Sequence, residues 1–271
     1  MADVKKMATR DGYGQGLIEL GRTRDDIIVM DADLAAATKT GAFKKEFPDK
    51  FYDCGIAEQN MMSIAAGIAA TGKVVFASSF AMFAAGRAFE QVRNSIGYPH
   101  LSVNIGATHA GISVGEDGAT HQCCEDIALM RTIPGMTIIN PADAVEAKAA
   151  TLAAAEIDGP VYLRFGRLAV PVINDEAAYR FELGKGIQLT EGSDVTIIAT
   201  GLMVERAQQA YELLKAEGIS ARVINIHTIK PLDEEIVLKA AGETGAIVVA
   251  EEHSVIGGLG SAVSELLAEP R

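Results

Sequence analysis

Short apolar runs alternate with longer alanine-rich segments along the first part of the chain, and the two kinds of segment predict different elements. The apolar runs have the length of strands, and they lie at 27–30, 74–77, 101–105, 137–139 and 161–165. The longer segments have helical periodicity, and they lie at 13–22, 58–70, 81–96 and 142–155. Because the strands read as continuous apolar runs between helices, we expect a parallel sheet covered by helices on both faces.

A second, shorter set of the same kind begins near residue 194. Its predicted strands lie at 195–199, 221–226 and 246–250, and its predicted helices at 204–217, 233–243 and 259–267. The polar, poorly periodic stretch between the sets is interpreted as a linker. The expected fold class is α/β with two domains, each a mainly parallel sheet flanked by helices. The expected boundaries are 1–167, a linker at 168–192, and 193–271, where the last helix runs so close to Arg271 that this domain could be incomplete at its end.

Composition and charge narrow the classes of function. The 271-residue chain carries 24 Lys and Arg against 36 Asp and Glu, a formal net charge of −12. Nucleic acids and anionic membranes are held mainly by positive charge, so neither is expected as a partner. No apolar run reaches the roughly 18–20 residues that span a bilayer, and the N-terminal residues lack an apolar signal core. We therefore expect a cytoplasmic protein.

Polar and aromatic side chains follow several of the predicted strands. Asp33 follows the first strand, Phe80 the second and His109 the third. Arg164 and Arg167 close the last strand of this set. Because ligands of open parallel sheets bind at the carboxyl ends of the strands, we expect a site at this edge of the first sheet.

The segment THAGISVGEDGATHQ, residues 108–122, holds the densest group of candidate side chains. It carries His109, Asp117 and His121 among three glycines. Histidine suits acid–base chemistry near neutral pH. A polar surface loop without a function is the simpler alternative. A metal site that also uses Cys123 is another, but the spacing matches no compact zinc pattern, and we predict no metal ligands in this chain.

Three other features allow both a structural and a functional interpretation. Phe80 and Phe83 have helical i, i+3 spacing, which is typical of core packing but would also suit a wall for a planar ligand ring. Arg10, like the two arginines after the last strand, could bind a phosphate with its forked donors or be an ordinary surface arginine. Glu58, in DCGIAEQNMM, could complement the dipole of a helix start or take part in proton transfer.

Three of these segments together resemble the second half of transketolase, which consists of the pyrimidine-binding domain and the C-terminal domain. They are GIAEQN around Glu58, SSFAMF around Phe80, and GISVGEDGATHQ, which contains His121. Several independent motifs in the same order argue against chance similarity, and the resemblance runs from about Arg10 to the end. It implies a cytoplasmic enzyme of the pentose phosphate pathway, which transfers a two-carbon ketol unit from a ketose phosphate to an aldose phosphate.

The resemblance implies a set of residues for the cofactor, thiamine diphosphate. Glu58 corresponds to the family's glutamate that hydrogen-bonds the aminopyrimidine ring. Phe80 and Phe83 correspond to aromatic residues that line this ring, and Asp33 to an aspartate near the cofactor. Burial of Glu58 would favour its protonated form, so that it could donate to the ring nitrogen.

A second set of residues is implied for the sugar substrates. His109, Asp117 and His121 correspond to residues that contact hydroxyl groups and the phosphate end. Arg10 corresponds to a phosphate-binding arginine, and Arg167 is the second arginine that we expect to bind the phosphate. Together with the glutamate named above, the two histidines are the predicted catalytic residues.

The chain departs from the family at several positions. Ala119 stands where proline is usual, and Ala110 where many members have aspartate. Gly86 takes the place of a third aromatic residue, and Ala37 that of a serine that often contacts phosphate. These changes leave the expected cofactor chemistry intact but weaken any assignment of the particular sugar.

The resemblance also implies a partner. Full-length transketolases have an earlier domain whose GDG…N motif holds the cofactor diphosphate through a divalent metal, and this motif is absent from the chain. We therefore expect the C-terminal subunit of a split transketolase. Its N-terminal partner subunit would supply the site for the diphosphate and for Mg²⁺ (or Ca²⁺ or Mn²⁺), in an α2β2 heterotetramer.

Other functions stay open. The enzyme 1-deoxyxylulose-5-phosphate synthase shares motifs of the GIAEQ and THQ types, although His109 together with EDG favours transketolase. The beta subunits of 2-oxo acid dehydrogenases are more distant. A non-catalytic α/β protein that only pairs with a partner is also conceivable, but such a protein has no reason to keep Glu58, His109 and His121.

Overall fold

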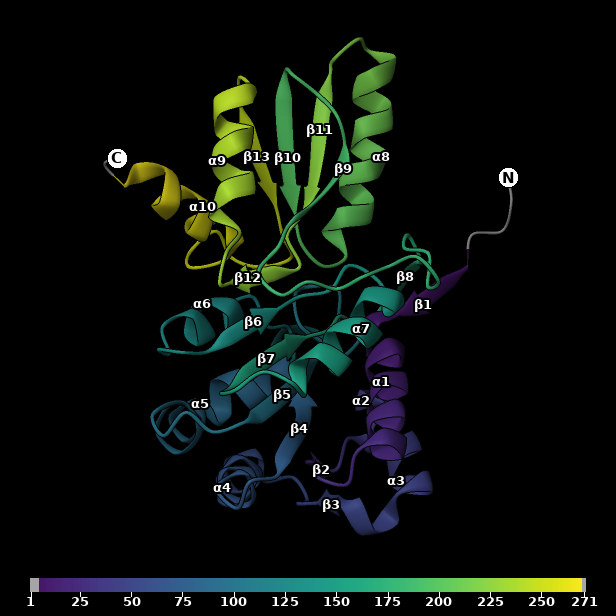
Figure 1. Ribbon diagram of the computed structural model, residues 1–271, viewed down its shortest axis with the longest axis vertical. Coiled ribbons are helices and arrows are strands. Elements are labelled where there is room, and N and C mark those ends of the chain that lie inside the picture. Colours follow the sequence, from purple (N-terminus) through teal and green to yellow (C-terminus); the bar gives the residue numbers. More distant parts are fainter. Residues whose placement is uncertain (1–4, 270–271) are drawn as a thin grey trace.

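The computed structural model describes residues 5–269, and it has two α/β units, one above the other in Figure 1. Each unit has parallel strands at the centre of a sheet and helices packed against it. This architecture is the α/β fold class expected from the sequence. The two ends, 1–4 and 270–271, lie outside the described residues, and so does Arg271 at the expected limit of the second domain.

The first unit is a seven-stranded sheet with the order β12-β6-β7-β5-β4-β2-β3, parallel except for β12. Its strands are β2 (Ile27–Asp31), β3 (Phe51–Asp53), β4 (Val74–Phe80), β5 (Val103–Thr108), β6 (Thr137–Ile139), β7 (Val161–Arg164) and β12 (Thr228–Lys230). Its helices are α1 (Thr9–Thr23), α2 (Ala35–Thr38), α3 (Gly41–Glu46), α4 (Glu58–Ala69), α5 (Phe89–Gln91), α6 (Asp126–Arg131) and α7 (Ala144–Ala154). Short helical turns lie at η1 (Pro48–Lys50), η2 (Met82–Arg87), η3 (Val92–Gly97) and η4 (Gly118–Thr120).

The second unit is a four-stranded sheet with the order β13-β10-β11-β9, in which only β9 is antiparallel. Its elements are β9 (Ile187–Thr190), β10 (Val195–Ala199), α8 (Met203–Ala216), β11 (Ala221–Asn225), α9 (Glu234–Glu243), β13 (Ile247–Ala250) and α10 (Leu259–Ala268). A separate two-stranded ribbon pairs β1 (Lys6–Ala8) with β8 (Ala169–Pro171). Within residues 5–269, no helix has the length and apolar character needed to cross a bilayer.

Glycine on α1 allows this helix to lie close against α7. A Cβ added to Gly12 would lie 2.1 Å from the carbonyl oxygen of Ala144, and one added to Gly16 would lie 2.8 Å from Cβ of Thr151. Such distances are too short for real side chains, so the small residues set the spacing between the two helices. The close packing fixes the start of α1, where Arg10 lies.

The structure differs from the expected elements in several places, and it adds the short helices α2, α3 and α6 and the strand β12. The expected helix at 81–96 is interrupted, because η2 and η3 have π-helical hydrogen bonding around a short α5. A π-turn accommodates one extra residue per turn and is common at functional sites. The stretch interpreted as a linker contains β8 and β9. The short strands β1 and β3 were missed, because three residues are too few for a recognisable pattern.

The two units are tied together by a crossing strand and by a buried carboxylate. Thr228 of β12 pairs with Ile139 of β6, so a strand from the second half of the chain completes the first sheet. Glu146 of α7 accepts hydrogen bonds from the Tyr179 hydroxyl at 2.6 Å and the Asn225 amide at 2.8 Å. Burial raises the pKa of Glu146 to about 7. The second unit is therefore held in a defined position beside the carboxyl ends of the first sheet.

Candidate active site

Glu58 lies buried at the first turn of α4, with only 1% of its surface exposed. Arg87 Nη1 donates to one carboxylate oxygen at 2.8 Å, and Ser79 Oγ donates to the other at 3.3 Å. A residue that only complements a helix dipole needs neither burial nor partners of this kind. The surroundings of Glu58 therefore favour a specific role over simple dipole compensation.

Arg87 is the main residue of this region that the sequence did not reveal. Its guanidinium lies 4.5 Å from the centre of the Phe83 ring, a cation–π contact, while it pairs with Glu58. The π-turn that closes from the Ala88 amide to the Phe83 carbonyl brings Phe83 and Arg87 to the same side of η2. Arg87 lies in the SSFAMFAAGR segment already noted, so its proximity to the two aromatic residues was the available signal.

The two predicted aromatic residues and the two predicted histidines form one cluster. Phe80 and Phe83 have ring centres 6.0 Å apart and are nearly parallel. The ring of His109 stacks on Phe80 at 3.9 Å, and His121 meets Phe83 edge-on at 5.1 Å. Phe80 and His109 thus meet at the ends of β4 and β5, as expected for residues at neighbouring strand ends, and Phe83 and His121 pack beside them.

His109 is held in a constrained position and in its neutral form. Its backbone has φ 58°, a left-handed conformation that is uncommon for a residue other than glycine. Its Nδ1 lies 3.0 Å from the Thr108 hydroxyl. Burial, together with the positive charges of Arg10 and Arg167, lowers the pKa of His109 to about 3. At neutral pH, His109 can therefore exchange hydrogen bonds with hydroxyl groups but does not add a positive charge.

Arg10 and Arg167 both lie close enough to His109 to influence its ionisation. Arg10 Nη1 donates to the carbonyl of Ala37 at 2.7 Å, whereas its Nε is buried without a hydrogen-bond partner among the described residues. Arg167 pairs with the exposed Glu116 at 2.9 Å, an interaction that a ligand could replace at little cost. These arginines form a local cationic region on an acidic protein.

Asp33 and Asp117 are both exposed, the first in the turn after β2 and the second in the loop after β5. Asp33 has φ 63°, and its amide donates to the Asp53 carboxylate at 3.2 Å. The buried Asp31 orders this turn by accepting hydrogen bonds from the Leu34 amide and the Thr38 hydroxyl, both at 2.6 Å. Burial raises the pKa of Asp31 to about 6. Asp117 directly precedes η4 in the loop that ends with His121.

Arg164, the less favoured candidate for a phosphate arginine, has a structural role instead. Its side chain is 3% exposed, and its Nε donates to Asp126 at 2.8 Å. Asp126 is fully buried and also accepts a hydrogen bond from the Tyr162 hydroxyl at 2.9 Å. A guanidinium enclosed in this way is not available to a sugar phosphate, so the possible phosphate role of Arg164 is withdrawn.

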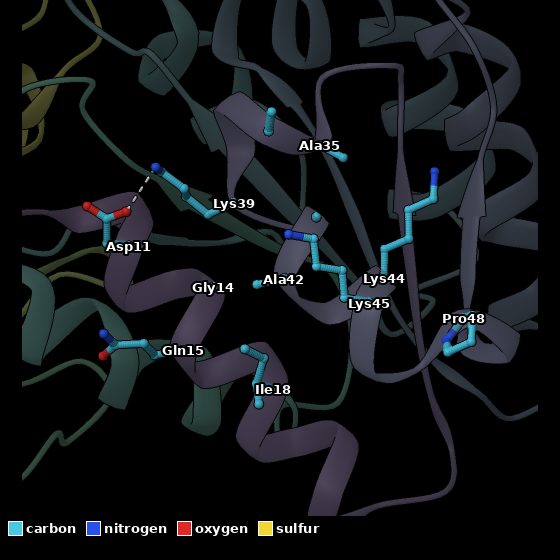
Figure 2. Close-up of a pocket in the computed structure, with 12 residues that line it drawn as sticks. Asp11, Gly14, Gln15, Ile18, Ala35, Lys39, Ala42, Lys44, Lys45 and Pro48 are labelled. Atoms are coloured by element: carbon cyan, nitrogen blue, oxygen red, sulfur yellow. Dashed lines mark ion pairs between the residues drawn. The ribbon is translucent and has the colours of Figure 1, made fainter.

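A cavity of about 940 Å³ lies away from this cluster, beside α1, α2 and α3 (Figure 2). Asp11 and Lys39 form an ion pair of 3.2 Å at its margin, and Ala35, Ala42 and Ile18 line it. None of the predicted site residues lines this cavity. In the described part of the chain, no three His, Cys, Asp or Glu side chains are arranged to hold a metal ion.

Comparison with known proteins agrees with the motifs in the chain. The family model "Transketolase, pyrimidine binding domain" matches residues 5–172, and "Transketolase, C-terminal domain" matches residues 184–271. A provisionally named transketolase C-terminal section of Methanocaldococcus jannaschii is 54% identical over 261 residues, which is 96% of this chain and 81% of that protein. A 6-deoxy-6-sulfo-D-fructose transketolase subunit of Clostridium sp. (strain MSTE9) is 46% identical over 260 residues, covering 96% and 80%.

A solved structure gives the same result. A split gene transketolase, described as an inactive beta4 tetramer, matches with a TM-score of 0.91 and 54% identity. The match covers 97% of this chain and 86% of that one. The expected family agrees with both family models, with the similar sequences and with the solved split gene transketolase. The expected relation to split-gene C-terminal sections agrees with them as well. The chain belongs to the transketolase family.

Proposed function

We propose that this chain is the C-terminal subunit of a thiamine diphosphate-dependent transketolase. Together with an N-terminal subunit, it would transfer a two-carbon ketol unit from a ketose phosphate to an aldose phosphate. The observation that carries the proposal is the buried Glu58 carboxylate, which is linked through Arg87 to the aromatic cluster. The similarity to a split gene transketolase supports the division into two subunits. A cytoplasmic location and a role in the pentose phosphate pathway are part of the proposal.

The residues present fit the pyrimidine half of the cofactor. Phe80 and Phe83 provide apolar ring faces, and Glu58 provides a buried carboxyl group beside them. Glu58 would hydrogen-bond the aminopyrimidine ring, and Asp33 would lie near the cofactor. Thiamine diphosphate, when bound, supplies the carbanion chemistry that side chains cannot perform.

Arg87 imposes a condition on this role. Pairing with a guanidinium stabilises the negative charge of the Glu58 carboxylate. The Arg87 guanidinium and the pyrimidine ring nitrogen would therefore compete for the Glu58 carboxyl group. The Arg87 side chain is 47% exposed whereas Glu58 is 1% exposed, so Arg87 can reach water on leaving, but the buried Glu58 then depends on its new partner.

The sugar substrate would lie over the cationic and histidine-rich part of the cluster. Arg10 and Arg167 would hold the phosphate, and the unpartnered Nε of Arg10 is a donor suited to this purpose. His109, His121 and Asp117 would bind hydroxyl groups, and the two histidines would move protons. The diphosphate and Mg²⁺ (or Ca²⁺ or Mn²⁺) would be held by the N-terminal subunit, in an α2β2 heterotetramer.

Replacing Arg10 with alanine should raise the KM for phosphorylated sugars about tenfold or more, because one charge-assisted hydrogen bond is lost. Steady-state kinetics of the two-subunit mixture would measure this change. Arg22→Ala is the matched control, since Arg22 lies on the same helix in an exposed ion pair with Glu46. An unchanged KM for Arg10→Ala would remove Arg10 from the substrate site.

The identity of the donor tests the proposed reaction. We expect the chain, mixed with its N-terminal subunit, thiamine diphosphate and Mg²⁺, to use a ketose phosphate as donor and an aldose phosphate as acceptor. Consumption of pyruvate with release of carbon dioxide would instead assign the chain to the 1-deoxyxylulose-5-phosphate synthase type. Complex formation without turnover of any donor would identify a non-catalytic partner.

A further inference from the structure

The loop at 111–122, called the substrate loop below, contains Asp117 and His121 and follows directly on His109. Its two ends are joined by an isolated antiparallel bridge. The Gly111 amide donates to the Cys123 carbonyl at 2.8 Å, and the Cys123 amide donates to the Gly111 carbonyl at 3.1 Å. The position of this bridge therefore determines where the loop stands above the aromatic cluster.

A residue of the second unit lies directly against the base of the substrate loop. Glu252, just after β13, accepts a hydrogen bond from the Ser113 amide at 2.5 Å. A Cβ added to Gly111 would lie 2.3 Å from Cδ of Glu252, so the carboxyl group packs on the bare Cα of this glycine. Gly111 also has φ +84°, a conformation that favours glycine. The Glu252 carboxyl group therefore occupies the space that a side chain at position 111 would need.

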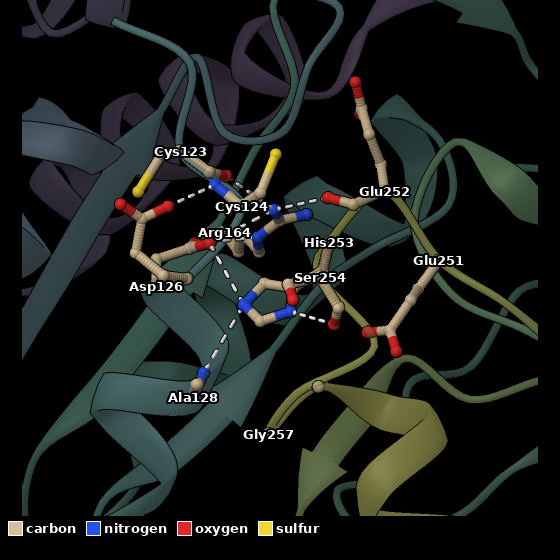
Figure 3. A network of polar contacts seen from close by, with 12 residues as sticks. Cys123, Cys124, Asp126, Ala128, Arg164, Glu251, Glu252, His253, Ser254 and Gly257 are labelled. Atoms are coloured by element: carbon tan, nitrogen blue, oxygen red, sulfur yellow. Dashed lines mark hydrogen bonds and ion pairs between the residues drawn. The ribbon is translucent and has the colours of Figure 1, made fainter. Parts of the chain in front are cut away.

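The backbone of Glu252 is itself firmly held. Arg164 Nη2 donates to the Glu252 carbonyl at 2.9 Å, while its Nε binds the buried Asp126 (Figure 3). The following residues are held as well, because the Ala128 amide donates to His253 Nε2 at 3.4 Å and the Ser254 amide donates to the Cys124 carbonyl at 2.8 Å. Figure 3 shows that the carboxylate of Glu252 points away from Arg164. It is therefore available to accept the hydrogen bond from the loop backbone. The buried ion pair between Arg164 and Asp126 therefore holds the backbone segment that carries Glu252.

We propose that Glu252 is a positioning residue, through which the C-terminal domain sets the height and orientation of the substrate loop. This inference rests on the proposed function, because it assigns the loop to the sugar site. It gives the second unit a role in the reaction, although that unit carries none of the predicted catalytic residues. Misplacement of a substrate-binding group by about 1 Å can cost about a hundredfold in rate.

Glu251 provides a matched comparison from the same segment. Its carboxylate points to the other side, where it accepts hydrogen bonds from the Leu259 amide at 2.7 Å and the Gly260 amide at 2.8 Å. It therefore stabilises the start of α10 and does not touch the substrate loop. A change at Glu251 perturbs the C-terminal domain, whereas a change at Glu252 perturbs the loop.

The test compares Glu252→Met, Glu252→Gln and Glu251→Gln in the two-subunit mixture. Glu252→Met should lower kcat/KM for the ketose phosphate about ten- to a hundredfold without changing the affinity for thiamine diphosphate. Glu252→Gln should recover most of the activity, because its amide oxygen can still accept from the Ser113 amide. Glu251→Gln should leave kcat/KM within about twofold, since its contacts lie at a helix start.

Amide hydrogen exchange of the full chain without substrate gives a readout that does not depend on turnover. Glu252→Met should speed exchange at 111–122 at least severalfold more than at α4, and Glu251→Gln should not. Unchanged exchange at 111–122 would overturn the positioning role, and so would an unchanged kcat/KM in an active mixture. If the wild-type mixture shows no transfer but the exchange result holds, the proposed function fails while the contact of Glu252 with the loop stands.

Discussion

Replacing Glu58 with glutamine should lower two-carbon transfer by the two-subunit mixture at least about a hundredfold, the range usual for loss of a general acid or base. Glutamine has nearly the same shape, and its amide oxygen can accept from Ser79 or Arg87. It cannot release and regain a proton, however. The expected result is therefore an enzyme that folds and assembles normally but does not turn over, measured as product formed from a ketose phosphate.

The control for this variant is Glu90→Gln, which makes the same chemical change at an exposed position on α5. It should retain full activity. Thermal unfolding should show that Glu58→Gln keeps the stability of the wild type, so that lost activity cannot be ascribed to lost structure. A Glu58→Gln enzyme with activity within a few fold of the wild type would refute the proton-transfer role.

Replacing Arg164 with methionine should lower the free energy of unfolding by about 3–5 kcal/mol, because it leaves Asp126 as a buried charge without its main partner. Asp126 is 0% exposed, and the Tyr162 hydroxyl and the His253 ring, whose Nε2 lies 3.8 Å away, would be its remaining polar neighbours. Arg164 also binds the carbonyl of Glu252, so the contact between the two units is weakened as well. Denaturant unfolding of the full chain measures this change.

Two further variants separate the buried charge from other effects of the substitution. Arg22→Met removes an arginine from an exposed pair with Glu46 and should leave the stability nearly unchanged. The double variant Asp126→Asn with Arg164→Met removes both charges and should recover part of the lost stability. A loss below about 1 kcal/mol for Arg164→Met alone would contradict the account of this ion pair.

The pattern of apolar runs predicted most of the fold. Strands such as β2, β4 and β10 are continuous and apolar because both faces of the sheet are covered, so their length and position follow from the sequence. The crossing strand β12 was not predicted. It has three residues, and its place in the first sheet depends on how the second unit packs, which local periodicity does not encode.

The candidate site, too, was predicted only in part from the sequence. Phe80 and His109 meet because both lie at strand ends, which gather at one edge of the sheet. Phe83 and His121, which were expected from the motifs, join them in the same cluster. The partner of Glu58 was missed, since an ion pair between α4 and a π-turn depends on tertiary packing. The support given by Glu252 was missed for a similar reason, as it joins residues more than a hundred positions apart.

The central claim is that this chain supplies the pyrimidine half of an active site that a second subunit completes. The most direct measurement is two-carbon transfer from a ketose phosphate to an aldose phosphate in three samples, each with thiamine diphosphate and Mg²⁺. The samples contain this chain alone, the N-terminal subunit alone, and both together. We predict transfer only in the mixture. Robust transfer by this chain alone would contradict the account.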